Sequence, residues 1–404
     1  MTRTLASAHT ALPVAGVELS ACTAGLKASG RPDLALVHLA PGSRTAAMFT
    51  RNAFCAAPVH VARDHLAATA PRILLINAGC ANAGTGREGE VDARRSCDHV
   101  AAATGVAASE VLPFSTGVIG KRLDLERLFR GVDDCVAAGF SPTGWEAAAT
   151  AMMTTDTRAK VASRRVALSG GAVTITGMAK GAGMIRPDMA TMLAFVATDA
   201  DVPADELDGL LRAAVDVSLH CITVDGDTST NDAVTLSATG ASGVTVTTDA
   251  DRTALADALA AVFIELAQAI VADAEGATRL IEIQVQGGGD VAECREVAFT
   301  VAHSPLVKTA VFGGDPNWGR ILAAVGRAPI NALEVAGVDI ALGAIPLVRQ
   351  GEPVAGYDEA AAASEMRAET VRITIGLGRG TAETRVWTSD LSHDYVRINA
   401  DYRT

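Results

Sequence analysis

The hydrophobic pattern of this chain switches repeatedly between a period of two residues and a period near 3.6, which limits the folds open to it. Apolar and polar residues alternate, as in half-buried strands, over residues 164–181, 279–288 and 369–380. Helical spacing marks residues 204–219 and 251–274. The first alternating segment turns at Gly170-Gly171 and predicts a hairpin. We therefore expect an α/β (α+β) protein with largely antiparallel sheets and helices on their outer faces, with a doubly wound parallel sheet as the alternative.

Charge and composition exclude several classes of protein. The formal net charge of −12 argues against a sequence-independent nucleic-acid binder, which needs clustered Lys and Arg. The chain contains no run of 18 apolar residues, and its first residues contain no continuous apolar region, so we expect neither a membrane span nor a secretory signal. Seven cysteines without a C-x-x-C pair indicate reduced thiols and a cytoplasmic protein.

No motif for a metal or cofactor is evident. The eight histidines form no H-E-x-x-H pattern or close pair, which makes a catalytic zinc improbable. The acidic segment 224–232, VDGDTSTND, lacks the glycine and the final acid of a calcium loop, so we interpret it as a turn. The G-x-x-x-x-G-K-[ST] phosphate loop and the G-x-S-x-G nucleophile elbow are also absent.

The most informative stretch is AKGAGMIRPDMATMLAFVATDA, residues 179–200. Gly181, Gly183 and Pro187 predict a loop in its first half, and TMLAFVA predicts a buried strand in its second half. The junction Ala190–Thr191 places a small residue and a hydroxyl at the mouth of that strand. The loop before Thr191 is also the sharpest break in a chain that has no linker-like segment.

A threonine becomes a useful nucleophile when it is the first residue of a chain, because its own α-amino group can then act as the base. That amine titrates near 7.7–8.0 in reference compounds, so about half or less of it is free base at neutral pH, which is enough for a base. Such a terminus would arise if the Thr191 hydroxyl attacked the Ala190 carbonyl and water then released the acyl group. The alternative is a threonine that merely begins a strand after a loop.

The segment KGAGMIRPDMATMLAF closely resembles the self-cleavage segment of the ornithine acetyltransferase / glutamate N-acetyltransferase family. Further blocks resemble the same family in the same order: INAGCANAGTG, VLPFSTGVIG, MMTTDT, ITVDGDTSTND, DAEGATRLIEI, FGGDPNWGRI and the terminal INADYRT. Together they span nearly the whole chain, which makes the resemblance highly specific. One departure is Asp188, where many members carry Asn, and it leaves the efficiency of cleavage open.

The resemblance implies autocatalytic cleavage between Ala190 and Thr191, giving an N-terminal (alpha) chain of residues 1–190 and a C-terminal (beta) chain of residues 191–404. Thr191 would be the nucleophile, and the Thr116 hydroxyl and Gly117 backbone N–H would stabilise the oxyanion. The implied fold is an α/β sandwich of the self-cleaving peptidase-like type, and the implied assembly is a heterotetramer of two alpha and two beta chains.

The resemblance also implies which residues contact the substrate. They are Thr154, Lys180, Thr191, Glu275, Asn399 and Thr404. Lys180 suits a substrate α-carboxylate, and Glu275 suits the side-chain ammonium of ornithine. A surface lysine and a solvated glutamate at a helix end are the structural alternatives. Thr155 adjoins Thr154, so the contact could be one residue further along.

The implied activity is transfer of the acetyl group of N2-acetylornithine to glutamate, in arginine biosynthesis, through an acetyl-Thr191 intermediate. No metal and no cofactor are expected, although acetyl-CoA could serve as a second acetyl donor. Two rival functions remain. One is an N-terminal-threonine aminopeptidase or amidase, with water as the acceptor, and the other is a non-catalytic homologue that binds an amino acid. The sequence leaves open how one pocket would accept both ornithine and glutamate.

Overall fold

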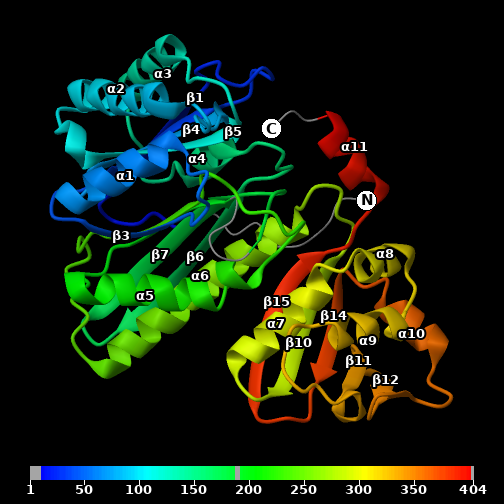
Figure 1. The fold of residues 1–404 in the computed structure, drawn as a ribbon. Coiled ribbons are helices and arrows are strands. Elements are labelled where there is room, and N and C mark those ends of the chain that lie inside the picture. Colours follow the sequence, from blue (N-terminus) through cyan, green and yellow to red (C-terminus); the bar gives the residue numbers. More distant parts are fainter. Residues whose placement is uncertain (1–10, 187–191, 402–404) are drawn as a thin grey trace. The chain divides into compact units, whose positions relative to one another are not determined.

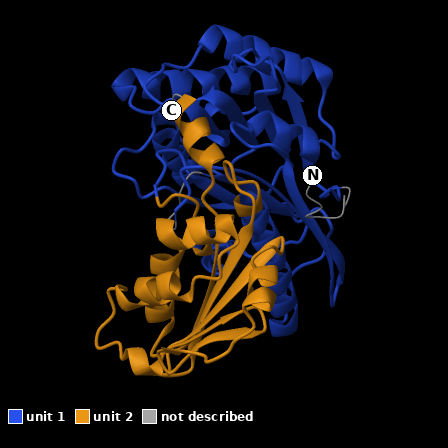
Figure 2. Cartoon of the chain, turned by 90° about the vertical axis from the view of Figure 1, so that its right-hand side faces the viewer, with its two compact units in different colours: residues 1–220, 227–270, 403–404 blue, residues 221–226, 271–402 orange. Residues whose placement is uncertain are grey.

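The computed structural model describes residues 11–186 and 192–401 of the chain. These residues form two compact units (Figure 2). Unit 1 holds the described residues up to 220 together with 227–270, and unit 2 holds 221–226 and 271–401. Each unit is therefore assembled from separate stretches of chain, which explains why no linker composition marks a boundary in the sequence.

The first sheet of unit 1 has the order β1-β2-β4-β5. Its strands are β1 (Val17–Cys22), β2 (Leu34–Leu39), β4 (Ile73–Cys80) and β5 (Val111–Val118). The first two pairings are antiparallel and β4 pairs with β5 in parallel. One face of this sheet is covered by α1 (Ala57–Ala68), α2 (Gly86–Thr104) and α3 (Leu125–Ala138). The α3 helix begins where the Asp124 carboxylate accepts the N–H of Arg127, as an N-cap does.

The second sheet of unit 1 has the order β3-β9-β8-β7-β6. Its strands are β3 (Arg44–Phe49), β6 (Lys160–Leu168), β7 (Gly171–Lys180), β8 (Leu193–Thr198) and β9 (Ala233–Ala238). Every pairing is antiparallel except β8 with β9. The helices α5 (Ala204–Asp216) and α6 (Asp249–Ala272) lie along this sheet (Figure 1).

The core between the two sheets of unit 1 also contains the short helix α4 (Trp145–Met152). The Phe114 ring of β5 meets the Phe195 ring of β8 edge to face, with 4.9 Å between their centroids. Trp145 is 1% exposed within the same cluster. Burial of the apolar face of each sheet against the other accounts for the two-layer arrangement.

The α6 helix is, among the described helices, the one with the length and apolar composition to cross a membrane. Its most apolar window has a mean hydropathy of 1.9, and 44% of that window is buried within the structure. Leu255, Phe263 and Leu266 are fully or almost fully buried, and Glu265 makes an ion pair with Arg164 of β6. Packing of this kind is typical of an apolar core helix.

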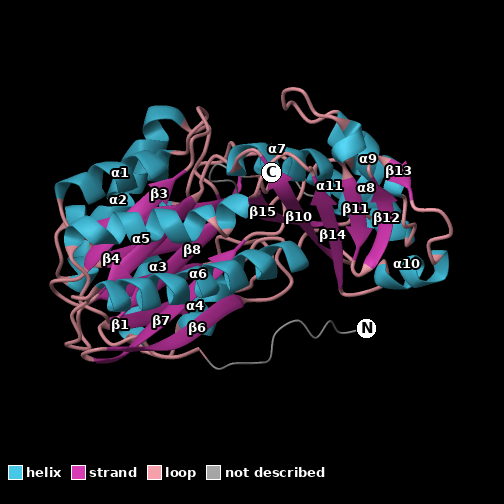
Figure 3. Cartoon of the chain, turned by 90° about the horizontal axis from the view of Figure 1, so that it is seen from below, coloured by secondary structure: helices cyan, strands magenta, loops and turns pink. Residues whose placement is uncertain are grey.

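Unit 2 is built on a sheet of order β13-β12-β11-β14-β10-β15. Its strands are β10 (Leu280–Gly288), β11 (Asp339–Leu342), β12 (Ile345–Arg349), β13 (Glu352–Pro353), β14 (Thr370–Gly376) and β15 (Ala382–Ser389). Only β10 and β14 pair in parallel among the described strands of this sheet. Its helices are α7 (Val291–Ala302), α8 (Pro305–Gly313), α9 (Trp318–Gly326), α10 (Glu359–Glu365) and α11 (His393–Asp401), drawn in Figure 3.

The expected fold class is confirmed: sheets that are mostly antiparallel lie against helices in both units (Figure 3). The predicted hairpin is formed by β6 and β7, which turn between Leu168 and Gly171. The segments 279–288 and 369–380 form β10 and β14, and the segments 204–219 and 251–274 contain α5 and most of α6. The strand predicted after Thr191 is β8, and all six of its residues are buried.

Candidate active site

The predicted oxyanion residues lie at the end of β5, in unit 1. Thr116 is 6% exposed, and its hydroxyl makes no hydrogen bond to any described residue. Gly117 has a φ of +129°, and a Cβ added to it would lie 2.5 Å from the carbonyl carbon of Gly79 on β4. Only glycine can adopt this φ without strain and leave room for the neighbouring strand. The parallel pairing of Gly79 with Gly117 therefore brings the backbones of β4 and β5 close together at this point.

Asn231, just before β9, holds this strand end in place. Its Nδ2 donates to the carbonyl oxygen of Ser115 at 3.0 Å and to that of Ala81 at 2.7 Å. The Ser115 hydroxyl in turn donates to Asn77 at 2.6 Å. Two side-chain bonds thus fix Ser115, the residue that directly precedes Thr116, as the preorganisation of a donor pair requires.

Asp232, the next residue, contacts the strand that follows the predicted nucleophile. Its Oδ1 accepts the backbone N–H of Met192 at 2.9 Å, and the side chain is almost fully buried. Adjacent Cα atoms lie about 3.8 Å apart. The dipeptide Asn231-Asp232 therefore brings the neighbour of Thr116 and the neighbour of Thr191 to the same place in unit 1.

Lys180 ends β7 and is 3% exposed, so it is a buried cation and not the surface lysine of the structural alternative. The buried carboxylate of Asp156 accepts hydrogen bonds from Lys160 Nζ at 2.6 Å and from the Gly181 N–H at 2.7 Å. Burial alone would raise the pKa of Asp156, but Lys160 and Lys180 outweigh it and hold that pKa well below the usual range. A buried carboxylate therefore stays charged at the end of β7 because two lysines act on it.

Thr154 is joined to this charged cluster through its backbone. Its N–H donates to Asp156 Oδ2 at 3.0 Å, and its carbonyl accepts from Arg31 at 3.0 Å. Lys27 lies nearby and donates to the carbonyl of Ala151 at 2.9 Å. Burial, together with Arg31, lowers the pKa of Lys27 to about 8. Cations near Thr154 suit a substrate that carries a carboxylate.

The two predicted contacts in unit 2 meet each other. Glu275 is 9% exposed, and its Oε2 accepts the Nδ2 of Asn399 on α11 at 2.8 Å. The α11 segment is held by Ser392, whose hydroxyl donates to the Gly276 carbonyl at 2.6 Å. Gly276 has a φ of +68°, and a Cβ there would collide with the backbone nitrogen of Tyr395. The turn after α6 is thus shaped to receive the last helix of the chain.

The sequence identified the blocks that contain Asp156, Asn231 and Asp232 but not these residues themselves. Acidic and amide side chains are common in turns, so nothing in the sequence distinguishes these three from their neighbours. Their burial and their bonds distinguish them in the structure. Three predicted positions, Ala190, Thr191 and Thr404, lie outside the described residues, as does Asp188.

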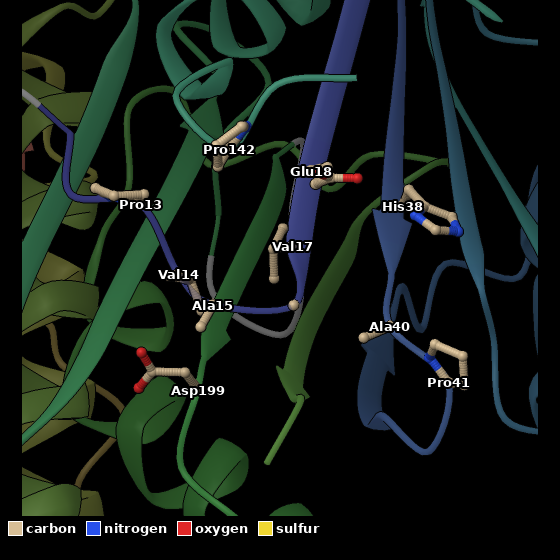
Figure 4. Close-up of a pocket in the computed structure, with 11 residues that line it drawn as sticks. Pro13, Val14, Ala15, Val17, Glu18, His38, Ala40, Pro41, Pro142 and Asp199 are labelled. Carbon is tan, nitrogen blue, oxygen red and sulfur yellow. The ribbon is translucent and has the colours of Figure 1, made fainter. Parts of the chain in front are cut away.

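A cavity of about 470 Å³ opens elsewhere in unit 1 (Figure 4). Its polar lining includes Glu18, His38 and Asp199, and none of the predicted site residues lines it. Burial and Arg72 lower the pKa of His38, so its ring is neutral at pH 7. Within residues 11–186 and 192–401, no group of three or more His, Cys, Asp or Glu is arranged to hold a metal ion.

Comparison with known proteins gives one consistent family. The model described as the ArgJ family matches residues 18–404. The "Arginine biosynthesis bifunctional protein ArgJ" of Methylococcus capsulatus is 53% identical over 394 residues, which is 97% of this chain and 96% of the relative. The protein of the same name from Pseudomonas fluorescens is 49% identical over 395 residues, 97% of each chain.

A solved structure is also similar. The crystal structure of the arginine biosynthesis bifunctional protein ArgJ from Bacillus halodurans is 41% identical, with a TM-score of 0.50. The match covers 52% of this chain and 98% of that chain. The solved chain is therefore about half as long as this one.

Proposed function

As a member of the ArgJ family, this chain is an acetyltransferase of arginine biosynthesis, and we propose that it carries the acetyl group of N2-acetylornithine to glutamate as an ester of Thr191. One observation carries the proposal. Asn231 binds the carbonyl of Ser115 and Asp232 binds the N–H of Met192, and this closeness of the residues next to Thr116 and Thr191 supports the proposal. The geometry is independent of the resemblance between sequences.

The proposed reaction begins with cleavage of the chain between Ala190 and Thr191. Support comes from the Bacillus halodurans chain, because a chain about half as long as this one is what cleavage near the middle would leave. Thr191 would then have a free α-amino group, which takes the proton of its own hydroxyl as the oxygen attacks the acetyl carbonyl.

Acetyl transfer would then follow a ping-pong route. The Thr116 hydroxyl and the Gly117 N–H stabilise the oxyanion, the C–N bond to ornithine breaks, and the amine returns its proton to the leaving ornithine nitrogen. Glutamate then attacks the ester through its amino group, which loses a proton as Thr191 is released. In this proposal Lys180 binds the substrate α-carboxylate, and Glu275, which contacts Asn399, binds the side-chain ammonium of ornithine. Thr154 and Thr404 complete the proposed substrate contacts.

Three further features belong to the same proposal. Acetyl-CoA serves as a second acetyl donor, which the word "bifunctional" in the names of the relatives supports, and no bound cofactor takes part. The cut chains assemble as a heterotetramer of two alpha and two beta chains. The cytoplasm is the proposed location, supported by the biosynthetic role and by seven cysteines that are all free thiols.

The test is the intact mass of the purified protein, compared with Thr191→Ala and Thr191→Ser. We expect the natural chain to separate into residues 1–190 and 191–404, and Thr191→Ala to stay whole and to lose acetyl exchange by at least about a thousandfold. Thr191→Ser keeps a hydroxyl and should retain some cleavage. Release of acetate without glutamate would favour the amidase alternative, and an uncut natural chain that binds N2-acetylornithine would favour the non-catalytic one.

A further inference from the structure

Two cysteines of unit 1 lie side by side where the end of β1 packs against α3 (Figure 1). Cys22 is the last residue of β1, and its thiol donates to the carbonyl of Gly131 on α3 at 3.1 Å. In an α-helix the carbonyl of residue 131 also accepts the N–H of residue 135, one turn further on. The Cys22 sulfur therefore lies beside the turn of α3 that carries Cys135, and the two thiols share a hydrogen bond.

The residues around the two cysteines make this close approach possible. Ser20 lies on the same face of β1 as Cys22, and its hydroxyl donates to the carbonyl of Cys135 at 2.8 Å. A Cβ at Gly131 would collide with that of Ala24, so this glycine allows α3 to lie close to the chain that follows β1. Both cysteines belong to the same apolar cluster of unit 1. The two thiols therefore meet because of the packing of β1 against α3.

The two thiols differ in exposure and in acidity. Cys135 is 0% exposed, whereas Cys22 is partly exposed. Their shared hydrogen bond, together with burial, raises the pKa of Cys22. The same bond and the Ser20 hydroxyl lower the pKa of Cys135 against the effect of burial, and Asp33 and Asp134 raise both pKa values. Such a pair gives up one proton and shares the other, so that a thiolate forms beside a thiol.

We propose that Cys22 and Cys135 are a redox-active pair that a hydroperoxide oxidises to a disulfide. The Cys22 sulfur attacks the peroxide: an S–O bond forms, the O–O bond breaks, and the leaving hydroxide becomes water with the proton that the pair had released. The Cys135 sulfur then attacks the Cys22 sulfur. An S–S bond forms, the S–O bond breaks, and a second water carries away the remaining thiol proton. The cysteines lose two electrons, which the peroxide gains, and a dithiol reverses the reaction.

This site goes beyond the proposed acetyl transfer and does not depend on it. Both cysteines lie in residues 1–190, so the disulfide would form within one chain whether or not the bond at 190/191 is cut. Trypsin should release Cys22 in residues 4–27 and Cys135 in residues 131–158, and each of these peptides contains a single cysteine. A crosslink between the two peptides therefore reports the disulfide directly.

Cys55 provides a matched control within the same unit. Like Cys22 it is partly exposed, but its thiol lies 3.9 Å from the carbonyl of Ala56. Burial raises its pKa, and the described charged groups that act on it are Arg63 and Asp232. Because no thiol is among these groups, Cys55 should oxidise slowly and should form no disulfide within the chain.

The experiment treats the reduced natural protein with hydrogen peroxide and maps its tryptic peptides by mass spectrometry without reduction. We expect peptides 4–27 and 131–158 to appear as one crosslinked species, which dithiothreitol separates again. The crosslink should form at least about tenfold faster than Cys55 is oxidised. In Cys135→Ser the sulfenic acid should persist on Cys22 and be trapped by dimedone, whereas Cys55→Ser should behave like the natural protein.

Three outcomes would overturn the proposal, and the first two need only the natural protein. One is a folded chain in which Cys22 and Cys135 stay as thiols while Cys55 is oxidised. Another is a crosslink that forms only in urea, because the packing of β1 against α3 would then not be responsible. The third is a Cys22 sulfenic acid that dimedone traps equally in the natural protein and in Cys135→Ser. The outcome is separate from that of the proposed function, because neither cleavage nor acetyl exchange is measured.

Discussion

Asp156 and Asp232 are two almost fully buried aspartates of unit 1 on which the charge of Lys180 acts, yet their pKa values are shifted in opposite directions. Asp156 accepts hydrogen bonds from Lys160 and from the N–H groups of Thr154 and Gly181, and its pKa is lowered by the nearby cations. Asp232 accepts hydrogen bonds from the N–H of Met192 and from the Ser229 hydroxyl, and its pKa is raised by burial. The charges and hydrogen-bond donors around a buried carboxyl, and not its burial alone, therefore decide the direction in which its pKa shifts.

The opposite pKa shifts indicate that the two aspartates have different roles. The Asp156 carboxylate is saturated, so it stabilises the fold around Thr154 and the end of β7. The Asp232 carboxyl instead holds the N–H of Met192, just before β8, and burial outweighs the charge of Lys180 in setting its pKa. Substitution of either aspartate, or of the lysine that acts on both, tests these two roles.

The largest effect is expected from Asp156→Asn. The substitution would leave the Lys160 ammonium, whose side chain is 0% exposed, without its counter-charge, and losing one partner of a buried pair costs roughly 3–5 kcal/mol. The free energy of unfolding in urea gives the measurement. Asp64→Asn is the control, because its pair with Arg94 is exposed and should contribute less than about 1 kcal/mol. Equal losses in the two variants would refute the structural role of Asp156.

A smaller loss of stability is expected from Lys180→Gln, about 1.5–3 kcal/mol, because Lys160 still neutralises Asp156. The effect on activity should be large, since Lys180 is the proposed contact of the substrate carboxylate. We expect KM for N2-acetylornithine to rise at least tenfold, measured by steady-state exchange. An unchanged KM with reduced stability would make Lys180 a structural counter-ion only.

The smallest effect is expected in the pH dependence of the free energy of unfolding. Its sign is opposite for the two aspartates. The stabilising contribution of Asp156, whose folded pKa is lowered, is present above the unfolded value near 3.9 and disappears as the pH falls through the folded pKa. Asp232, whose folded pKa is raised, contributes below the unfolded value and loses that contribution as the pH rises through the folded pKa.

Urea unfolding of Thr191→Ala chains at several pH values tests this contrast without interference from cleavage. Adding Asp232→Asn should have little effect near pH 4 and should stabilise the chain at pH 8, by about 1.4 kcal/mol for each pKa unit of the shift. Adding Asp156→Asn should destabilise it at pH 8 and less so at pH 3. Parallel profiles for the two variants would contradict pKa shifts of opposite direction at the two aspartates.

The sequence predicted the elements of the fold well, because periodicity and turn residues act locally. The hairpin of β6 and β7, the buried β8 and the helix α5 all follow from such patterns. The two compact units could not be predicted, since unit 2 includes residues 221–226, far from the rest of it along the chain. Long-range contacts of this kind leave no local signal.

The residues of the candidate site were predicted less completely than the elements of the fold. Thr116, Gly117, Lys180, Glu275 and Asn399 came from the resemblance, and their roles stay predictions. The structure adds that Asn399 donates a hydrogen bond to Glu275. The roles of Asn231 and Asp232 depend on bonds between residues 40 to 150 positions apart, which one sequence without relatives does not reveal. The division at 190/191 and the role of Thr191 stay predictions.

The pairing of β7 with β8 has a consequence for refolding. The two strands are joined residue by residue from Ile175–Thr198 to Lys180–Leu193, and the proposed cut falls in the connection between them. A newly made chain therefore closes this sheet as a first-order event within one molecule. Once cut and denatured, the same sheet can form again only by collision of two separate chains, so its recovery becomes second order and depends on concentration. Cleavage would in this way turn a reversible folding reaction into a history-dependent one.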